Sequence, residues 1–251
     1  MNRPAAPRAT LTIARFTDAD RELWLTSATT VLSDAEQDWV SKTRDADLRT
    51  QHAVGRALLR LIGGRATGRP ARTLRVVVSE VGQPALGDAV NVHLSVAHTT
   101  GVVAVAAAAA AVGVDIEPMM PAGGDQRRLA QRLFAEPEVA ALEQVGEEEL
   151  ADWFARLWTI KEAVGKALGV GIVPALAGAV LERRDGRFAL RSMWTDPPAE
   201  RWTLHQLAAP GQGERVAVAV AAPEVELEPP VLLCLADFSR DCAVAAKLPP
   251  G

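Results

Sequence analysis

The sequence predicts an α+β fold of two similar halves, because the order strand, helix, strands occurs twice along the chain. Short segments of alternating apolar and polar residues indicate strands, and two long segments have the apolar spacing of amphipathic helices. We place the first half at residues 1–111 and the second at 112–223, although no strong sequence repeat relates them. The tail at 224–251 is rich in proline and acidic residues and receives no predicted structure.

In the first half, the alternation in residues 10–16 predicts a strand. Ser33, followed three residues later by Glu36, is typical of a helix N-terminus. One long, arginine-rich helix is expected from there to the glycine pair Gly63 and Gly64. Further strands are expected at 74–78, 92–96, 102–107 and 111–116. The strands expected at 102–107 and 111–116 could pair with each other as a hairpin.

In the second half, residues 126–144 are expected to be helical with an interruption around Pro137. Residues 147–168 have a strong apolar stripe and predict a long amphipathic helix. Strands are expected at 179–182, 187–190, 203–206 and 216–221. The second half therefore ends in strands, as the first half does.

Composition excludes several classes of protein. The net charge of −4 gives no general attraction to nucleic acid. The two cysteines, Cys234 and Cys242, have no metal-binding spacing and fit a reducing compartment. The longest apolar run, 102–114, is shorter than the roughly 20 residues that a membrane helix needs. No signal peptide is recognisable, and we expect a cytoplasmic protein without a membrane or nucleic-acid partner.

Two carboxylates alternate within the segment Gly113–Glu117. Asp115 and Glu117 would project from the same face of a strand, since side chains alternate along it. That spacing suits chelation of one Mg²⁺, which prefers oxygen ligands and usually takes one or two carboxylates together with substrate phosphates. The alternative is a solvated strand end that carries two acids by chance.

The segment Trp158–Lys166 adds a third carboxylate and two of the four lysines of the chain. Glu162 and Lys166 are four residues apart and would share one face of a helix. The alternative is a surface salt bridge worth about 0.3–0.5 kcal/mol. Gly165 favours a functional site, because a glycine inside a helix costs about 1 kcal/mol and indicates a close approach.

His98 follows an apolar strand and precedes a turn that contains Gly101. A lone histidine is more often structural, but this position also suits a contact with phosphate. The other histidines, His52, His93 and His205, show no partner spacing, and we expect them to be structural.

The two long motifs together resemble the Sfp-type 4'-phosphopantetheinyl transferase family. That family carries G-[VI]-D-[IV]-E and then W-[ST]-x-K-E-[AS]-x-x-K about 40–50 residues later, and both motifs are complete here, at 113–117 and 158–166. Weaker family blocks appear in the same order at 55–60, 82–86, 94–99 and 132–138. The resemblance covers roughly residues 30–222.

The resemblance implies a monomer of two pseudo-symmetric α+β halves with coenzyme A bound in the cleft between them. It also implies transfer of the phosphopantetheine arm to a serine of an apo acyl or peptidyl carrier protein, with release of 3',5'-ADP. The carriers would belong to fatty-acid, polyketide or nonribosomal peptide biosynthesis. The metal would be magnesium, with manganese as the alternative.

By match to the family motifs, Asp115, Glu117 and Glu162 would bind the metal on the pyrophosphate of coenzyme A. Lys166 would contact the phosphate and assist the leaving group. Glu162 would deprotonate the carrier serine, directly or through water. The catalytic set would therefore be Glu162, Lys166 and Asp115. Lys161 would lie at the phosphates or near the carrier.

His98 would hold the 3'-phosphate, but the remaining contacts depart from the family pattern. Gln83 follows Gly82 where a lysine or arginine is expected, Ala97 replaces a serine, and Gln51 stands in place of an arginine. Two further basic positions fall on Glu36 and Trp39. Four residues are candidate substitutes: Lys42, Arg44, Arg49 and Arg56. The expected coenzyme A contacts are His98, Lys161, Lys166, Gly82, Gln83, Arg49 and Arg56.

Two other functions use the same residues. A metal-dependent pyrophosphohydrolase would cleave coenzyme A or a nucleotide without a carrier, although it would not need the Trp158–Lys166 motif. A non-catalytic module would bind the carrier or coenzyme A only. The complete set of Asp115, Glu117, Glu162 and Lys166 argues against this module.

Overall fold

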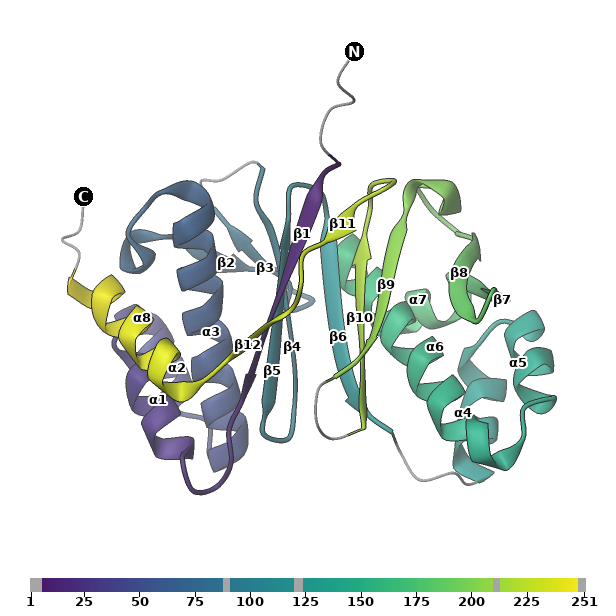
Figure 1. Ribbon diagram of the computed structural model, residues 1–251, viewed down its shortest axis with the longest axis horizontal. Helices are drawn as coiled ribbons and strands as arrows, with labels where there is room; N and C mark the ends of the chain where they lie inside the picture. The colour runs from purple at the N-terminus through teal and green to yellow at the C-terminus, as the bar shows by residue number, and fades with distance from the viewer. Residues whose placement is uncertain (1–5, 88–90, 120–123, 210–212, 248–251) are drawn as a thin grey trace, which may run out of the picture. The chain divides into compact units, whose positions relative to one another are not determined.

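The computed structural model describes residues 6–87, 91–119, 124–209 and 213–247, in two compact units (Figure 1). The first unit consists of Ala9–Ala109 and Leu227–Gly251. The second unit consists of Met1–Arg8 and Ala110–Glu226. Each unit contains β-sheet and helices, which confirms the α+β class. Among the described residues, no helix combines the length and apolar character required to cross a bilayer.

The first unit is built on one mixed sheet. In the described residues its strands follow the order β11-β1-β5-β4-β3-β2, and β12 runs parallel to β1. The strands are β1 Arg8–Arg15, β2 Val76–Val78, β3 Pro84–Leu86, β4 His93–Thr99, β5 Val102–Ala108, β11 Glu226–Leu227 and β12 Val231–Leu233. All residues of β5 are buried, and this strand lies in the sheet between β1 and β4.

Helices cover one face of this sheet (Figure 1). They are α1 Arg21–Thr29, α2 Asp34–Ser41, α3 Ala46–Thr67, the short η1 Ala71–Thr73 and α8 Leu235–Lys247. The tail, which had no predicted structure, supplies β11, β12 and α8. Phe238 of α8 is fully buried and stacks on Trp24 of α1, with ring centroids 4.8 Å apart. The tail thus completes the core of the first unit.

The expected single helix of the first half is two helices, so this prediction was wrong. The capping box of Ser33 and Glu36 is confirmed and begins α2. Asp45 begins α3 by accepting a hydrogen bond from a backbone amide. Gly63 does not end α3, since its missing side chain makes room for Leu86 instead. The helix ends at Gly68, whose φ of 68° is the left-handed conformation that glycine adopts readily.

The second unit has a three-stranded sheet in the order β6-β10-β9 and a separate hairpin of β7 and β8. Its strands are β6 Val112–Pro118, β7 Val180–Arg184, β8 Arg187–Ser192, β9 Thr203–Ala208 and β10 Glu214–Val220. Its helices are α4 Gly124–Leu133, α5 Glu136–Glu143, α6 Glu147–Leu168, α7 Ile172–Gly178 and the short η2 Ala199–Arg201. The predicted interruption at Pro137 and the helix at 147–168 are confirmed.

The hairpin considered for the strands at 102–107 and 111–116 does not form. Strand β5 pairs with β1 and β4, whereas β6 pairs with β10 in the other sheet. Between these strands the chain passes from one unit into the other. Two consecutive apolar strands look alike locally, and the choice between one sheet and two depends on partners far away in the sequence. The expected symmetry of the halves and the cleft between them stay predictions.

Candidate metal and phosphate site

The two long motifs meet where α6 packs on β6. A Cβ atom added to Gly113 would lie 1.8 Å from the carbonyl oxygen of Ala163, so the two backbones touch at this point. Only glycine permits this approach. The contact places the carboxylates of β6 opposite the Glu162 and Lys166 face of α6, and so brings together residues 45 or more positions apart.

Three carboxylates converge at this contact. One oxygen from each of Asp115, Glu117 and Glu162 lies within 4.8 Å of the other two. Lys166 Nζ donates to Asp115 Oδ1 at 2.7 Å and lies 3.8 Å from Glu162 Oε2. The buried Asp115 Oδ2 finds no hydrogen-bond partner among the residues that the structure describes.

An unsatisfied buried carboxylate oxygen is costly unless a cation or a donor completes it. The donor set, three carboxylates at chelating separation, is the one that hard divalent cations prefer. The residues therefore fit a divalent metal ion, as the sequence predicted for this set.

Burial is the main cause of the raised pKa values in this group. It raises the pKa of Glu117 to about 7, with a further contribution from the charges of Asp115 and Glu162 and an opposing one from Lys166. Burial also raises the pKa of Asp115, which Lys166 opposes. The pKa of Glu162 is raised by burial and then by Asp115. Neighbouring carboxylates with raised pKa values repel one another when all are ionised, and a bound cation stabilises their ionised forms.

An apolar pocket of about 270 Å³ adjoins Glu117. Its lining residues come from β6, α4 and α6: Glu117, Pro118, Leu129, Phe154, Ala155 and Trp158. Trp158 of the second motif thus lines a pocket beside the carboxylates. The site combines a charged centre with an adjacent apolar surface, which is common in small-molecule sites.

Lys161 lies elsewhere, in the core of the second unit. Its side chain has no exposed surface and forms an ion pair with the equally buried Glu138, at 2.8 Å between Nζ and Oε2. Nζ also donates to the carbonyl oxygens of Leu176 and Ala179. The expected contact of Lys161 with phosphate or carrier does not fit this position, because all its donors face protein acceptors.

In the first unit, His98 lies exposed at the end of β4 and belongs to a cluster that we call the His98 cluster: Trp39, His52, Arg56 and His98. His52 stacks on Trp39, with centroids 4.4 Å apart, and meets the ring of His98 edge to face at 5.7 Å. The guanidinium carbon of Arg56 lies 5.2 Å from the centre of the Trp39 ring.

Burial, together with the charges of His98 and then Arg56, lowers the pKa of His52 to about 4. His52 is therefore neutral at pH 7, where Arg56 is a cation. His52 shows no partner spacing in the sequence, but in the structure its ring contacts Trp39 and His98. Sequence reasoning missed this cluster because Trp39 lies on α2, His52 and Arg56 on α3, and His98 on β4. The one local signal is the four-residue spacing of His52 and Arg56.

Of the four basic substitutes considered, Arg56 joins the His98 cluster, whereas the exposed Lys42 pairs with Asp38 at 2.6 Å. Gly82 and Gln83 lie in the turn between β2 and β3, where the Gln83 amide donates to Ser79 Oγ. Gln51 is buried and donates to Asp47. Arg49 Nε is also buried, without a hydrogen-bond partner among the described residues.

The match of this chain to a known protein family falls within its second unit. Residues 111–221 match the family model of the 4'-phosphopantetheinyl transferase superfamily. A 4'-phosphopantetheinyl transferase of Bacillus subtilis is 27% identical over 138 residues, which is 55% of this chain and 60% of the relative. The 4'-phosphopantetheinyl transferase HetI of a Nostoc species is 30% identical over 128 residues, 49% of this chain and 54% of the relative.

A third relative, a putative 4'-phosphopantetheinyl transferase of a Synechocystis species, is 44% identical over 61 residues, 24% of each chain. The first two matches span only between half and two thirds of the relatives' own length. Both long motifs lie inside the segment that matches the family model. The predicted resemblance of this chain to the Sfp-type 4'-phosphopantetheinyl transferase family is confirmed, and the match to the family model covers residues 111–221.

Proposed function

We propose that this protein transfers the 4'-phosphopantetheine arm of coenzyme A to a serine of an apo acyl or peptidyl carrier protein and releases 3',5'-ADP. The observation that carries the proposal is the convergence of Asp115, Glu117 and Glu162 within 4.8 Å, with Lys166 2.7 Å from Asp115. The names of the relatives support the same reaction. The acceptor is a separate protein, and the enzyme acts as a monomer.

Asp115, Glu117 and Glu162 would hold Mg²⁺, or Mn²⁺, through their carboxylate oxygens. When bound, the metal would neutralise charge on the pyrophosphate of coenzyme A and stabilise the charge that develops on the leaving group. Asp115 Oδ2 is the best candidate ligand atom, because it is buried and lacks a hydrogen-bond partner among the described residues.

The transfer is a substitution at phosphorus. Glu162 takes the proton of the carrier serine, and the serine oxygen forms a bond to the phosphorus that carries the pantetheine. The bond from that phosphorus to the bridging oxygen breaks, and its electron pair leaves with 3',5'-ADP. Burial and then the charge of Asp115 raise the pKa of Glu162, which makes its carboxylate a better proton acceptor.

Lys166 is the cation for the phosphate oxygens. It lies on the same face of α6 as Glu162, and its ion pair with Asp115 orients the ammonium group. Its side chain is 31% exposed, so a ligand can reach the ammonium group. Donation from Lys166 to the leaving phosphate stabilises the charge that forms when the bond to the bridging oxygen breaks.

The apolar pocket beside Glu117 would accept the apolar part of the pantetheine arm, against Phe154 and Trp158. In the first unit, the His98 cluster would take the 3'-phosphate. Arg56 supplies a permanent charge, and the exposed His98 supplies a ring N–H, while Trp39 and His52 hold the two in place. The proposal thus assigns Arg56, rather than Lys42, to the place of the missing basic residues.

Intact-protein mass spectrometry tests the reaction. An apo carrier mixed with this protein, coenzyme A and Mg²⁺ should gain one phosphopantetheine, of the order of 340 Da from its covalent chemistry. EDTA and the substitution Glu162→Ala should each abolish the gain, whereas Glu200→Ala, an exposed acid of the same unit, should not. No gain on any of several acyl and peptidyl carriers would contradict the proposal. Cleavage of coenzyme A without a carrier would favour the pyrophosphohydrolase.

A further inference from the structure

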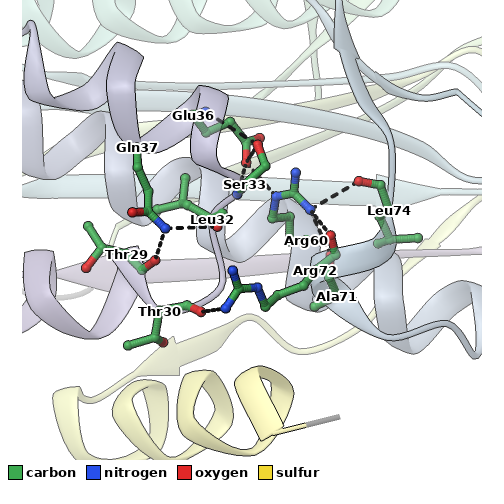
Figure 2. Close-up of polar contacts among 10 residues, drawn as sticks. All are labelled: Thr29, Thr30, Leu32, Ser33, Glu36, Gln37, Arg60, Ala71, Arg72 and Leu74. Carbon is green, nitrogen blue, oxygen red and sulfur yellow. Dashed lines mark hydrogen bonds and ion pairs between the residues drawn. The ribbon is translucent and has the colours of Figure 1, made fainter. Parts of the chain in front are cut away.

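Arg60 of α3 is a buried cation with several partners (Figure 2). Only 3% of its side chain is exposed. Its Nε donates to Glu36 Oε2 at 2.6 Å. Its Nη1 donates to the carbonyl oxygens of Ala71, Arg72 and Leu74 at 2.9, 3.2 and 3.1 Å. A buried guanidinium is tolerated only when its donors are satisfied in this way.

The carboxylate of Glu36 has a second task at the beginning of α2. Its Oε2 accepts from both the amide and the hydroxyl of Ser33, each at 3.0 Å. The next residue, Gln37, donates to the carbonyl oxygens of Thr29 and Leu32 at 3.2 Å (Figure 2). The N-terminal turn of α2 is therefore fixed to α3 through one carboxylate and to the preceding loop through one amide.

The same two helices carry three members of the His98 cluster. Trp39 is three residues after Glu36 on α2, and Arg56 is four residues before Arg60 on α3. Both pairs are therefore about one helical turn apart, or roughly 5 Å along the helix axis. A change in the tilt of α2 at Glu36 would move Trp39 away from His52 and Arg56.

We propose that the ion pair of Arg60 and Glu36 is a positioning device for phosphate binding. It sets α2 so that Trp39 holds His52 and Arg56 in the orientation that binds the 3'-phosphate of coenzyme A. The inference rests on the proposed function of the His98 cluster. Arg60 and Glu36 contact no ligand themselves, since both are committed to protein partners.

The test compares two nucleotides that differ only in the 3'-phosphate, 3',5'-ADP and 5'-AMP, by calorimetry on the full-length protein. The ratio of their dissociation constants measures the contribution of the 3'-phosphate. Glu36→Gln removes the charge but keeps a side chain that the capping box accepts at this position. Asp38→Asn removes the same charge from the exposed side of the same helix and is the matched control.

Glu36→Gln should reduce the ratio of dissociation constants at least fivefold, while Asp38→Asn should leave it within twofold of the wild-type value. In transfer assays Glu36→Gln should raise the KM for coenzyme A and leave kcat unchanged. Arg60→Lys keeps the charge but cannot serve Glu36 and three carbonyl oxygens at once, so it should behave like Glu36→Gln.

The two proposals fail in different ways. If His98→Ala and Arg56→Met leave the ratio unchanged, the His98 cluster does not bind the 3'-phosphate and both proposals fall. If these two variants reduce the ratio but Glu36→Gln does not, the cluster stands and the positioning role is overturned. A Glu36→Gln variant that unfolds at lower temperature but binds with the wild-type ratio likewise overturns it. If Arg60→Lys does not fold, the nucleotide binding of the folded Glu36→Gln protein decides between these outcomes.

Discussion

The two units bury a cation at matching places in their long helices, with different consequences. α3 and α6 each have 22 residues, and Arg60 and Lys161 each lie fourteen residues after the first residue of their helix. Each cation pairs with the glutamate at the third position of a short helix, Glu36 in α2 and Glu138 in α5.

The likeness extends beyond the ion pairs. Arg60 and Lys161 both donate to backbone carbonyl oxygens of the segment after their helix. Eight residues further on, Gly68 and Gly169 end the two helices with φ values of 68° and 66°. These matching positions favour the expected relation between the halves, which stays a prediction.

The difference lies in the next residue. Arg60 is followed by the buried apolar Leu61, and Lys161 by Glu162 of the carboxylate group. Lys161 is thus part of the core, whereas Glu162 beside it faces the carboxylate group for which we propose the chemistry. Adjacent residues of one motif have different surroundings, because they lie on different faces of the helix.

The largest effect is expected from replacing Glu162 of α6 by leucine, the residue type that α3 has at the matching position, Leu61. Glu162→Leu should lower the rate of transfer by about 10²–10⁴-fold, because a general base and a metal ligand are both lost. Circular dichroism should show a folded protein, since Glu162 is not part of the core. A transfer rate within tenfold of wild type would show that Glu162 is not the base.

Removing one partner of the buried pair should affect stability. Lys161→Met leaves Glu138 buried without its cation and should lower the free energy of unfolding by about 3–5 kcal/mol, measured by urea denaturation. The double variant Lys161→Met with Glu138→Leu should recover most of the loss. Lys166→Met, by contrast, should reduce transfer.

Amine-reactive labelling of the folded protein checks the same difference without mutation. Without coenzyme A the 31% exposed Lys166 should react. The fully buried Lys161 should not react in either the absence or the presence of coenzyme A. Labelling of Lys161 that coenzyme A suppresses would place Lys161 at the ligand instead.

The contact of β6 and α6 should tolerate no side chain at Gly113. Gly113→Ala places a methyl group 1.8 Å from the carbonyl oxygen of Ala163, and α6 must move. We expect a loss of about 1–3 kcal/mol in the free energy of unfolding, typical of overpacking, together with weaker Mn²⁺ binding measured by electron paramagnetic resonance. Gly146→Ala, with open space around it, is the matched control. Unchanged Mn²⁺ affinity would show that this backbone contact does not position the metal ligands.

The pH dependence of stability should differ between the units, because burial raises the pKa of Glu117 in the second unit from its ordinary value of 4.5 to about 7 in the folded protein. Between these two values the folded state binds more protons than the unfolded state, so the free energy of unfolding decreases as pH rises from about 4.5 to 7. Glu117→Gln should flatten this dependence in metal-free urea titrations. Mn²⁺ affinity of the wild type should rise across the same range, since the metal needs the ionised carboxylates.

The smallest effect is expected at Trp39, which is 40% exposed. Trp39→Ala should weaken binding of 3',5'-ADP a few-fold, because Arg56 and His52 lose the ring that holds them. A cation–π contact at an exposed site is worth about 0.5–1 kcal/mol, which corresponds to this range. Calorimetry measures the change, and binding of 5'-AMP is the control. Equal losses for both nucleotides would show that Trp39 contacts another part of the ligand.

The sequence by itself determined the α+β class and the helix at 147–168, and it singled out the three carboxylates that the structure brings together, Asp115, Glu117 and Glu162. These depend on local patterns: an alternation along a strand, a periodicity along a helix, and two motifs whose residue types suit one chemistry. The capping box of Ser33 and Glu36 is local in the same sense, and it was predicted correctly.

Tertiary structure decided the rest. It separated β5 from β6, closed the first core with Phe238 of the tail, buried Lys161 and brought Trp39 and His52 to His98. Each of these features depends on a partner from another element, and a local sequence pattern does not identify that partner. A lysine in a motif looks the same whether it faces a ligand or a buried glutamate. Only the packing of α5, α6 and α7 around Lys161 distinguishes the two, because it removes water and supplies the acceptors.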